Sequence, residues 1–365
     1  MPVSYSDRIA GLRARMKVTG TDLVAIGPSS QMVWLAGLSP HGDERPVMLL
    51  VTQGYAGFLM PALNVDSSRK HTDLPMFAWS DAEGPQAALD ELLKACAIDR
   101  SNVGVVLDET MRADFALLLL DALPGARRSF TGETVSFLRA RKDQDEYRVL
   151  KAGAIINDRA MQAGFEALRP GVTELEVAEA IRDAFKSQGA APLFTSVCFG
   201  ANGAFPHHHT GGTALKAGEA VLLDIGGRFQ DYSSDMTRVA HSGGPGTAFQ
   251  RIHGIVEAAV DAALAAARPG APASAVDKAA RDVIAAAGYG DHFVHRTGHG
   301  LGLDTHEPPY ITATEETVLE EGMVFSIEPG IYLPGKFGMR LEEIVILRKD
   351  GPEILSELTR APFLF

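Results

Sequence analysis

The sequence contains very little cysteine. Among its 365 residues only Cys96 and Cys198 are cysteines, and neither belongs to a CxxC motif. Disulfide scaffolds and thiolate zinc sites both need several cysteines at short spacings. The sequence therefore excludes both classes, and it favours a reducing, cytoplasmic compartment.

Positive charge is also scarce. The chain has 34 Lys and Arg residues against 46 Asp and Glu residues, which gives a formal net charge of −12. Proteins that bind phosphate backbones need clustered positive charge. We therefore expect no nucleic-acid partner.

Long hydrophobic runs and phosphate-binding glycine motifs are missing as well. No window approaches the roughly 18 consecutive apolar residues of a membrane span, and the N-terminal MPVSYSDRIAGLRARMK mixes charged with apolar residues. Neither GxGxxG nor GxxxxGK[ST] occurs at a strand-to-helix turn. We expect no membrane association and find no support for nucleotide binding.

The length suggests about two domains, at roughly 150 residues each. The segment RARKDQDE at 139–146 is dense in charge and is interpreted as a solvated connection, which divides the chain into domains at 1–140 and 141–365. The first domain alternates strands with helices, as an α/β layer domain does. Its expected helices span 6–19, 87–97 and 111–120, and its expected strands span 22–26, 46–51, 55–60 and 103–107, with 55–60 returning antiparallel to 46–51.

The second domain contains an internal repeat. RPGVTELEVAEAIRDAFKSQG begins at Arg169 and RPGAPASAVDKAARDVIAAAG begins at Arg268, and they are identical at 8 of 21 positions. Pro-Gly ends one helix in both copies, and Thr173 with Glu176 has capping-box spacing at the start of the next. A chance match between two Ala-rich helices is the alternative. The repeat predicts two similar α+β halves related by a pseudo-twofold axis, with ligands bound between them.

Each copy of the repeat is followed by a β-hairpin that carries acidic residues. In AVLLDIGGRFQDYSSDMTRVA the turn residues extend from Gly226 to Asp231. A turn centred directly after Phe229 places Asp224 opposite Asp235. Two carboxylates that face each other across a ladder repel unless a positive charge lies between them.

The second hairpin, MVFSIEPGIYLPGKFGMRLEEIVIL, repeats the arrangement. A turn centred on Gly335 places Glu328 opposite Glu342. A single acid here would be interpreted as a solvated charge on an edge strand. Two acidic pairs inside such apolar strands instead predict a site built from four carboxylates.

A glycine-rich loop supplies an imidazole to the same site. His299 lies among Gly298, Gly300 and Gly302, which permit positive φ and close backbone approach, and His306 follows seven residues later. Four carboxylates with one nitrogen suit Mn, Fe, Co or Zn. Two such ions about 3.5–4 Å apart would offset the carboxylate repulsion and activate a water molecule.

These motifs resemble a known family. DIGG…SDMTR, GHGLGLDTHE, SIEPGIY and GMRLEE are similar to the pita-bread metallopeptidases, which include prolidase, aminopeptidase P, methionine aminopeptidase and the metal-free relative creatinase. The first domain looks like the creatinase/prolidase N-terminal domain. The resemblance implies two divalent ions (Mn, Co or Zn), with Asp235 and Glu342 bridging both. The implied metal ligands are Asp224, Asp235, His299, Glu328 and Glu342.

The resemblance also implies roles around the metals. His207 matches a substrate-side histidine, His306 the histidine that stabilises the tetrahedral intermediate, and Arg340 an arginine near the S1′ side. Glu328 would accept a proton from water and pass it to the leaving nitrogen. Tyr310 stands where dipeptidase relatives often carry an arginine for the substrate carboxylate, which predicts tolerance of longer peptides. His208 and His209 are expected in an exposed loop.

The function implied by the resemblance is hydrolysis of Xaa-Pro bonds in short, proline-containing peptides. The enzyme would be a dipeptidase or an aminopeptidase, and a homodimer in which one N-terminal domain borders the partner's active site. Two alternatives stay open, namely a metallohydrolase of a non-peptide amide or other small substrate and a non-catalytic binding protein.

Overall fold

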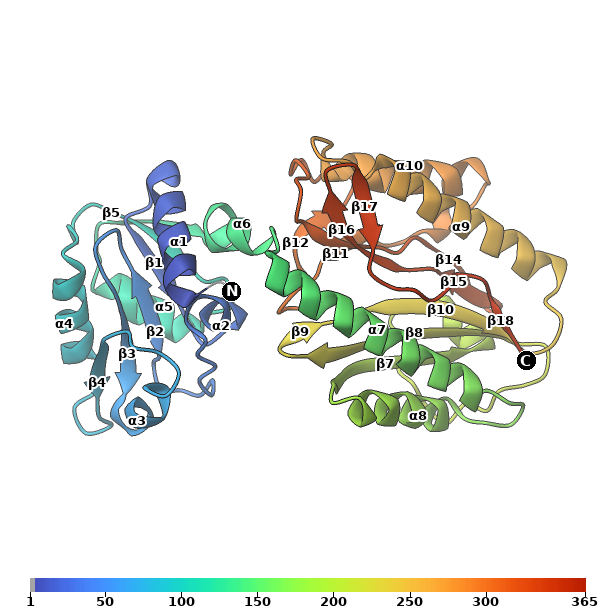
Figure 1. Ribbon diagram of the computed structural model, residues 1–365, viewed down its shortest axis with the longest axis horizontal. Coiled ribbons are helices and arrows are strands. Elements are labelled where there is room, and N and C mark those ends of the chain that lie inside the picture. The colour runs from blue at the N-terminus through green and yellow to red at the C-terminus, as the bar shows by residue number, and fades with distance from the viewer. Residues whose placement is uncertain (1–3) are drawn as a thin grey trace. The chain divides into compact units, whose positions relative to one another are not determined.

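The structure is a computed structural model that describes residues 4–365. It divides into two compact units, the first ending at Arg139 and the second spanning Ala140–Phe365 (Figure 1). No helix among the described residues is long and apolar enough to cross a bilayer.

The first unit is built on a mixed sheet with helices beside it. Its strand order is β4-β3-β2-β1-β5-β6, with β2 antiparallel to both β1 and β3 and the remaining pairs parallel. The antiparallel return predicted for 55–60 is confirmed. The strands are β1 (Leu23–Ile26), β2 (Met48–Val51), β3 (Ala56–Pro61), β4 (Met76–Trp79), β5 (Val103–Leu107) and β6 (Ala126–Phe130). The helices are α1 (Tyr5–Thr19), α2 (Ser30–Ala36), α3 (Val65–Ser68), α4 (Gln86–Cys96), α5 (Ala113–Asp121) and α6 (Val135–Arg139).

Burial explains which elements of this unit could be predicted. The central strands β1, β2 and β3 are buried at every position, so each reads as a continuous apolar run. The edge strands β4 and β6 are largely unburied, and α2, α3 and α6 are short. Sequence reasoning missed these five elements, which are short or lie at an edge of the sheet.

The second unit contains two halves, each with a pair of helices and an antiparallel sheet. The first half has α7 (Gln144–Ala167), α8 (Glu174–Ser187), and strands β7 (Ala191–Phe199), β8 (Ala220–Phe229), β9 (Tyr232–Ser233) and β10 (Met236–His241). The C-terminal strand β18 (Phe363–Leu364) pairs with β10. The second half has α9 (Thr247–Ala266), α10 (Ala273–Ala286), and strands β11 (Gly298–Gly300), β12 (Glu307–Ile311), β13 (Val324–Ile327), β14 (Gly330–Leu333), β15 (Phe337–Arg340), β16 (Glu343–Arg348) and β17 (Gly351–Ile354).

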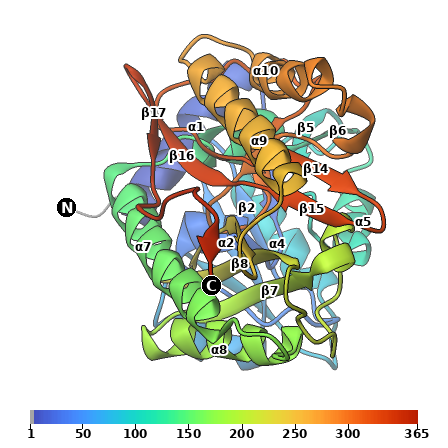
Figure 2. The same ribbon diagram turned by 90° about the vertical axis from the view of Figure 1, so that its right-hand side faces the viewer.

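The predicted repeat is confirmed by matching backbone geometry. Gly171 and Gly270 have φ of 89° and 91°, and their amides donate to Leu215 and Leu319 at 2.7 and 2.8 Å. Thr173 caps α8 with the expected capping box. Helices α8 and α10 lie on opposite sides of the strands (Figures 1 and 2). The chain thus builds the same helix-and-hairpin unit twice around one central layer of strands.

The charged segment at 139–146 is not solvated as expected. Arg139, Lys142 and Glu146 are buried. Lys142 forms an ion pair with the buried Glu307, and Glu146 accepts a hydrogen bond from the Tyr232 hydroxyl at 2.8 Å. Charged side chains can be buried where a partner offsets the loss of hydration, and such partners cannot be seen in the local sequence.

Candidate metal centre

The first hairpin brings Asp224 and Asp235 to one face, but in a different register from the predicted one. Gln230 and Asp231 form the turn, with φ of 48° and 69°, and Asp224 lies opposite Thr237 rather than Asp235. The register differs by two residues. Because side chains alternate with a period of two, both carboxylates still point to the same side.

Two glycines that the sequence analysis assigned to the turn are not part of it. Gly226 and Gly227 lie inside β8 instead of in the turn. A Cβ on Gly226 would lie 2.2 Å from the Phe194 ring, and one on Gly227 would lie 2.5 Å from the Phe185 ring. The glycines therefore let aromatic side chains pack against the strand. In the sequence alone, a Gly-Gly pair at this position looks like part of a turn.

The second hairpin has the predicted register. Gly330 pairs with Arg340 in the β14–β15 ladder, and Ile327 pairs with Glu343 in the β13–β16 ladder. Glu328 and Glu342 face each other in the short interval between these two ladders. The Gly335 turn, with φ of 74°, sets this register.

His299 on β11 turns one ring nitrogen toward the carboxylates. Nδ1 lies 3.1 Å from the Gly300 carbonyl oxygen, which can accept its N–H. Nε2 lies 3.2 Å from Glu328 Oε1 and 3.8 Å from Asp235 Oδ2. Gly298 allows a close approach, because a Cβ there would lie 1.9 Å from the Ser326 carbonyl oxygen. Gly298, Gly300 and Gly302 do not adopt the positive φ that glycine permits.

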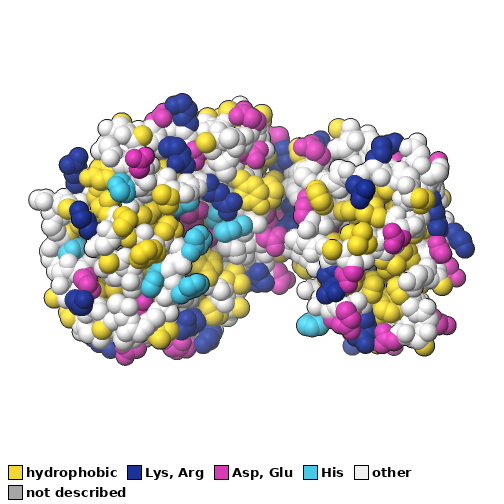
Figure 3. Space-filling model, turned by 180° about the vertical axis from the view of Figure 1, so that it is seen from behind, with side chains coloured by type: hydrophobic (Ala, Val, Ile, Leu, Met, Phe, Trp, Pro, Cys, Tyr) yellow, Lys and Arg dark blue, Asp and Glu magenta, His cyan; other side chains and the backbone are white. Residues whose placement is uncertain are grey.

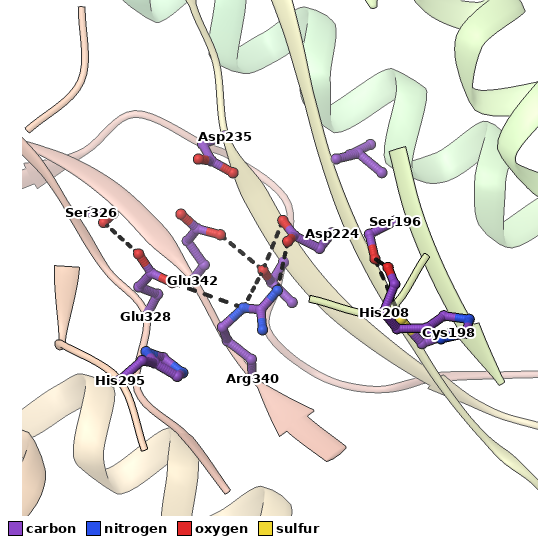
Figure 4. A network of polar contacts seen from close by, with 12 residues as sticks. Ser196, Cys198, His208, Asp224, Asp235, His295, Ser326, Glu328, Arg340 and Glu342 are labelled. Carbon is purple, nitrogen blue, oxygen red and sulfur yellow. Dashed lines mark hydrogen bonds and ion pairs between the residues drawn. The ribbon is translucent and has the colours of Figure 1, made fainter. Parts of the chain in front are cut away.

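The five residues proposed as metal ligands lie together, and His306 joins them. Figure 4 shows Asp224, Asp235, Glu328 and Glu342 arranged around Arg340. Among the described residues, three overlapping groups offer ligand atoms within 4.8 Å of one another. The groups are Asp235–His299–His306, His299–Glu328–Glu342 and Asp224–Asp235–Glu342.

The electrostatics of this cluster fit a bound cation. Burial, followed by the repulsion of neighbouring carboxylates, raises the pKa of Asp235 and of Glu342 well above the ordinary range. Burial also raises the pKa of Asp224. Oε1 of Glu342 is buried with no hydrogen-bond partner. Divalent cations would offset this repulsion and supply the missing partner.

Glu328 differs from the other three carboxylates. Burial raises its pKa, but the hydrogen bond and charge of His299 and the charge of Arg340 outweigh that effect and lower the pKa to about 2. Ser326 also donates a hydrogen bond to Glu328 Oε1 at 3.0 Å. Glu328 is therefore the carboxylate of the cluster that is most readily ionised.

Arg340 lies inside the cluster and is 4% exposed. It donates from Nη2 to Asp224 at 2.6 Å, from Nε to the Thr237 hydroxyl at 2.9 Å and from Nη1 to the Tyr332 hydroxyl at 2.7 Å. The Thr237 hydroxyl in turn donates to Glu342 Oε2 at 2.9 Å. Arg340 and Thr237 thus orient two of the proposed ligands. Sequence reasoning missed Thr237 and Tyr332.

The loop that carries His207 is held by a buried carboxylate. His207 and His209 are exposed, whereas His208 lies 3.0 Å from Oε2 of Glu174, which is 0% exposed. His209 is exposed as expected, whereas His208 is half-buried against Glu174. Glu174 also accepts from the Phe199 amide, the Asn202 side chain and the Gly211 amide at 3.0, 2.8 and 2.9 Å. No local sequence signal marked Glu174, because its partners lie 25 to 37 residues away.

His306 and Tyr310 lie close to His299 in the second half. The rings of His299 and His306 are 4.0 Å apart, and Tyr310 pairs with His299 across the β11–β12 ladder. Desolvation, then the neighbouring His299 and then Arg296, lower the pKa of His306 to about 4. The Arg296 guanidinium lies over the Tyr310 ring, 4.8 Å from its centroid. Histidine side chains gather with cationic and acidic ones on one face of this unit (Figure 3).

Comparison with known proteins assigns both units. Residues 148–349 match the profile of metallopeptidase family M24, and residues 8–140 match the creatinase/prolidase N-terminal domain. The chain is 37% identical to a probable dipeptidase PepE of Mycobacterium tuberculosis over 355 residues, which cover 95% of this chain and 93% of that protein. It is 34% identical to an Xaa-Pro dipeptidase of Lactobacillus helveticus, over 93% of this chain and 94% of the relative.

Solved structures agree with this assignment. A recombinant prolidase from Thermococcus sibiricus superposes with a TM-score of 0.92 and 32% identity, covering 100% of both chains. The dipeptidase PepE of Mycobacterium ulcerans superposes with a TM-score of 0.93 and 35% identity, covering 99% of this chain and 97% of the other. The chain therefore belongs to metallopeptidase family M24, with a creatinase/prolidase N-terminal domain preceding the pita-bread domain.

Proposed function

We propose that the protein is a metal-dependent exopeptidase that hydrolyses Xaa-Pro bonds in short peptides, as a dipeptidase or an aminopeptidase. The observation that carries the proposal is the buried cluster of four carboxylates beside His299, in which Glu342 Oε1 has no partner. A binding scaffold has no need for repelling acids in its core. The relatives named Xaa-Pro dipeptidase and prolidase support the choice of substrate.

Two divalent ions, Mn, Co or Zn, would be held by Asp224, Asp235, His299, Glu328 and Glu342, with Asp235 and Glu342 shared between them. Asp235, Glu342 and His299 each belong to two of the three ligand groups, and of these only the two carboxylates have two oxygens with which to contact both ions. When bound, the ions supply Lewis acidity and lower the pKa of a water molecule. Arg340 and Thr237 hold Asp224 and Glu342 in place for this purpose.

The chain's own groups would handle the proton and the developing charge. Glu328 would accept the proton of the attacking water and pass it to the leaving nitrogen, and the Ser326 hydroxyl, which donates to its Oε1 at 3.0 Å, orients the carboxylate. His306, beside His299, donates a hydrogen bond to the oxygen of the scissile carbonyl as it becomes negative. His207 is exposed on its loop, where it can contact the substrate. Tyr310 and Arg340 are the other two residues proposed to bind the substrate.

We further propose that the enzyme acts in the cytoplasm as a homodimer. Both cysteines are free and buried, and burial raises the pKa of each thiol to about 11. Such unreactive, unpaired thiols fit a reducing compartment. Size-exclusion chromatography with light scattering tests the dimer, and a monomeric mass would contradict it.

Hydrolysis of Ala-Pro, Ala-Pro-Ala and Ala-Ala, after separate loading with Mn, Co or Zn, tests the proposed function. We expect cleavage of at least one proline peptide, with Ala-Ala cleaved far more slowly. Which of the two proline peptides is preferred separates a dipeptidase from an aminopeptidase. If no ion supports cleavage of either peptide, the proposed function is wrong.

A further inference from the structure

Arg296 carries a positive charge beside the candidate metal centre, and no acid in the described part of the chain forms an ion pair with it. Its side chain is half-buried. Within residues 4–365, no carboxylate forms an ion pair with it. The neighbouring arginines behave differently, since Arg281 is paired with Asp277 at 2.9 Å and Arg340 with Asp224 at 2.6 Å.

Arg296 lies on the same side of the β11–β12 strands as the proposed metal ligand His299. Its guanidinium lies over Tyr310, which pairs directly with His299 across the ladder. Residues paired across an antiparallel ladder present their side chains on the same face. The guanidinium also lies within electrostatic range of His306, whose ring centroid is 4.0 Å from that of His299. Arg296 is therefore on the side of the strands where the proposed ligands lie.

The contact with Tyr310 leaves the edge of the Arg296 guanidinium available for hydrogen bonding. An aromatic ring under a guanidinium occupies one of its faces, while the N–H donors at its edge stay free. That edge matches a carboxylate, which can accept two parallel hydrogen bonds. Because Tyr310 covers one face and no carboxylate of residues 4–365 pairs with the edge, the N–H donors of Arg296 are available to a ligand.

We propose that Arg296, supported by Tyr310, binds a carboxylate of the peptide substrate. This inference rests on the proposed function and names a specificity-determining residue for it. The carboxylate has two sources in short peptides, the free C-terminus of a dipeptide or an acidic side chain. Sequence reasoning found no cation here and predicted tolerance of longer peptides from Tyr310 alone. If the C-terminus is the source, Arg296 instead favours dipeptides.

Two pairs of substrates distinguish these sources. Ala-Pro and Ala-Pro-amide differ only at the C-terminal carboxylate, and Glu-Pro-amide and Gln-Pro-amide differ only in the side-chain charge. The metal-loaded wild type, Arg296→Gln and Arg296→Lys are compared by kcat/KM. For a C-terminal source, Arg296→Gln lowers the Ala-Pro to Ala-Pro-amide ratio about tenfold or more, since charged hydrogen bonds are lost. For a side-chain source, the Glu-Pro-amide to Gln-Pro-amide ratio falls instead. Arg296→Lys keeps the charge and retains part of either preference.

Arg251→Gln is the matched control. Arg251 on α9 also lies over a tyrosine, 5.9 Å from the Tyr289 centroid, but outside the ligand groups. It should leave both ratios unchanged. Bound metal and the thermal midpoint are measured for every variant, so that loss of ions or of folding is detected.

The outcomes separate this inference from the proposed function. If Arg296→Gln changes neither ratio, or lowers kcat/KM for all four substrates by one factor, then Arg296 does not recognise a carboxylate. In that case a wild type that still cleaves these peptides leaves the proposed function standing. A wild type that cleaves none of the four overturns both.

Discussion

Arg340 Nη2 donates a hydrogen bond to Asp224 Oδ2 at 2.6 Å, inside a cluster where the remaining groups are chiefly acidic. This arginine comes from β15 in the second half and the aspartate from β8 in the first. The contact therefore joins the two repeats at the site itself. It leaves Asp224 partly neutralised and Asp235 and Glu342 dependent on other cations.

Removal of Arg340 should strongly destabilise the metal-free protein. Arg340→Ala leaves Asp224, whose side chain is 20% exposed, without its partner, and breaking one side of a buried ion pair costs up to about 3–5 kcal/mol in the free energy of unfolding. Arg348→Ala is the control, because its pair with Glu353 is about one-third exposed and should cost about 1 kcal/mol or less. Denaturant unfolding in the presence of chelator measures both. Equal losses for the two variants would contradict the structural role of Arg340.

Asp235→Asn should abolish activity and lower the bound metal, because Asp235 belongs to two of the three ligand groups. Asp231→Asn is the matched control. Asp231 is exposed at the hairpin turn with φ of 69°, a conformation that asparagine tolerates. Elemental analysis and kcat are compared for both variants. Full metal content with near wild-type turnover in Asp235→Asn would refute the ligand assignment.

The metal-free protein should lose stability with rising pH through Glu342. Burial and the nearby Glu328 and Asp224 raise its pKa well above the ordinary 4.5. Below pH 4.5 Glu342 is protonated in both the folded and the unfolded chain. As pH rises from there toward the folded pKa, only the unfolded chain ionises, so the stability conferred by the folded protonated state is lost.

Glu342→Gln should remove this loss. The free energy of unfolding of the variant, relative to that of the chelated wild type, should increase as pH rises above about 4.5. Glu353→Gln is expected to show the opposite trend, because hydrogen bonds from Tyr147 and Arg348 lower the pKa of Glu353 despite its partial burial. A stability difference for Glu342→Gln that is flat between pH 4 and pH 8 would contradict the prediction.

His306→Ala should leave the bound metal largely intact and lower kcat by about two orders of magnitude, the usual cost of losing one oxyanion donor. His209→Ala, in an exposed position, serves as the control and should have little effect. Because His306 also belongs to one ligand group, metal content decides its role. Loss of metal would make it a ligand, and a higher KM with unchanged kcat would assign it to ground-state binding.

Glu174 should act through the loop that carries His207. Glu174→Gln removes acceptors from buried donors and should lower the free energy of unfolding by about 1–3 kcal/mol, whereas Glu179→Gln removes only a surface ion pair. The effects of Glu174→Gln and His207→Ala on kcat/KM should be less than additive, because Glu174→Gln already displaces the loop that carries the His207 side chain. Strict additivity would show that Glu174 has only a structural role.

The sequence by itself was sufficient where local patterns carry the information. The apolar runs of β1, β2 and β5, the capping box at Thr173 and the Gly335 turn all depend on neighbouring residues, and each was predicted. The turn at Gly335 placed Glu328 opposite Glu342 because a hairpin's register follows from its turn. The repeat that starts at Arg169 and at Arg268 is also a local pattern, and it indicated two matching halves.

Only the tertiary structure decided the features that depend on residues far apart in the chain. The packing of Phe185 and Phe194 on Gly226 and Gly227 places these glycines inside β8, whereas the sequence alone assigned them to the turn. The burial of Lys142, of Glu174 and of the Arg340–Asp224 pair each requires a partner from 25 or more residues away. The sequence did not predict that Arg296 lies near the metal centre. That position follows from its contact with Tyr310, which pairs with His299 in the ladder. A buried charge destabilises the protein unless a partner of opposite charge lies beside it, and only the tertiary fold places that partner there.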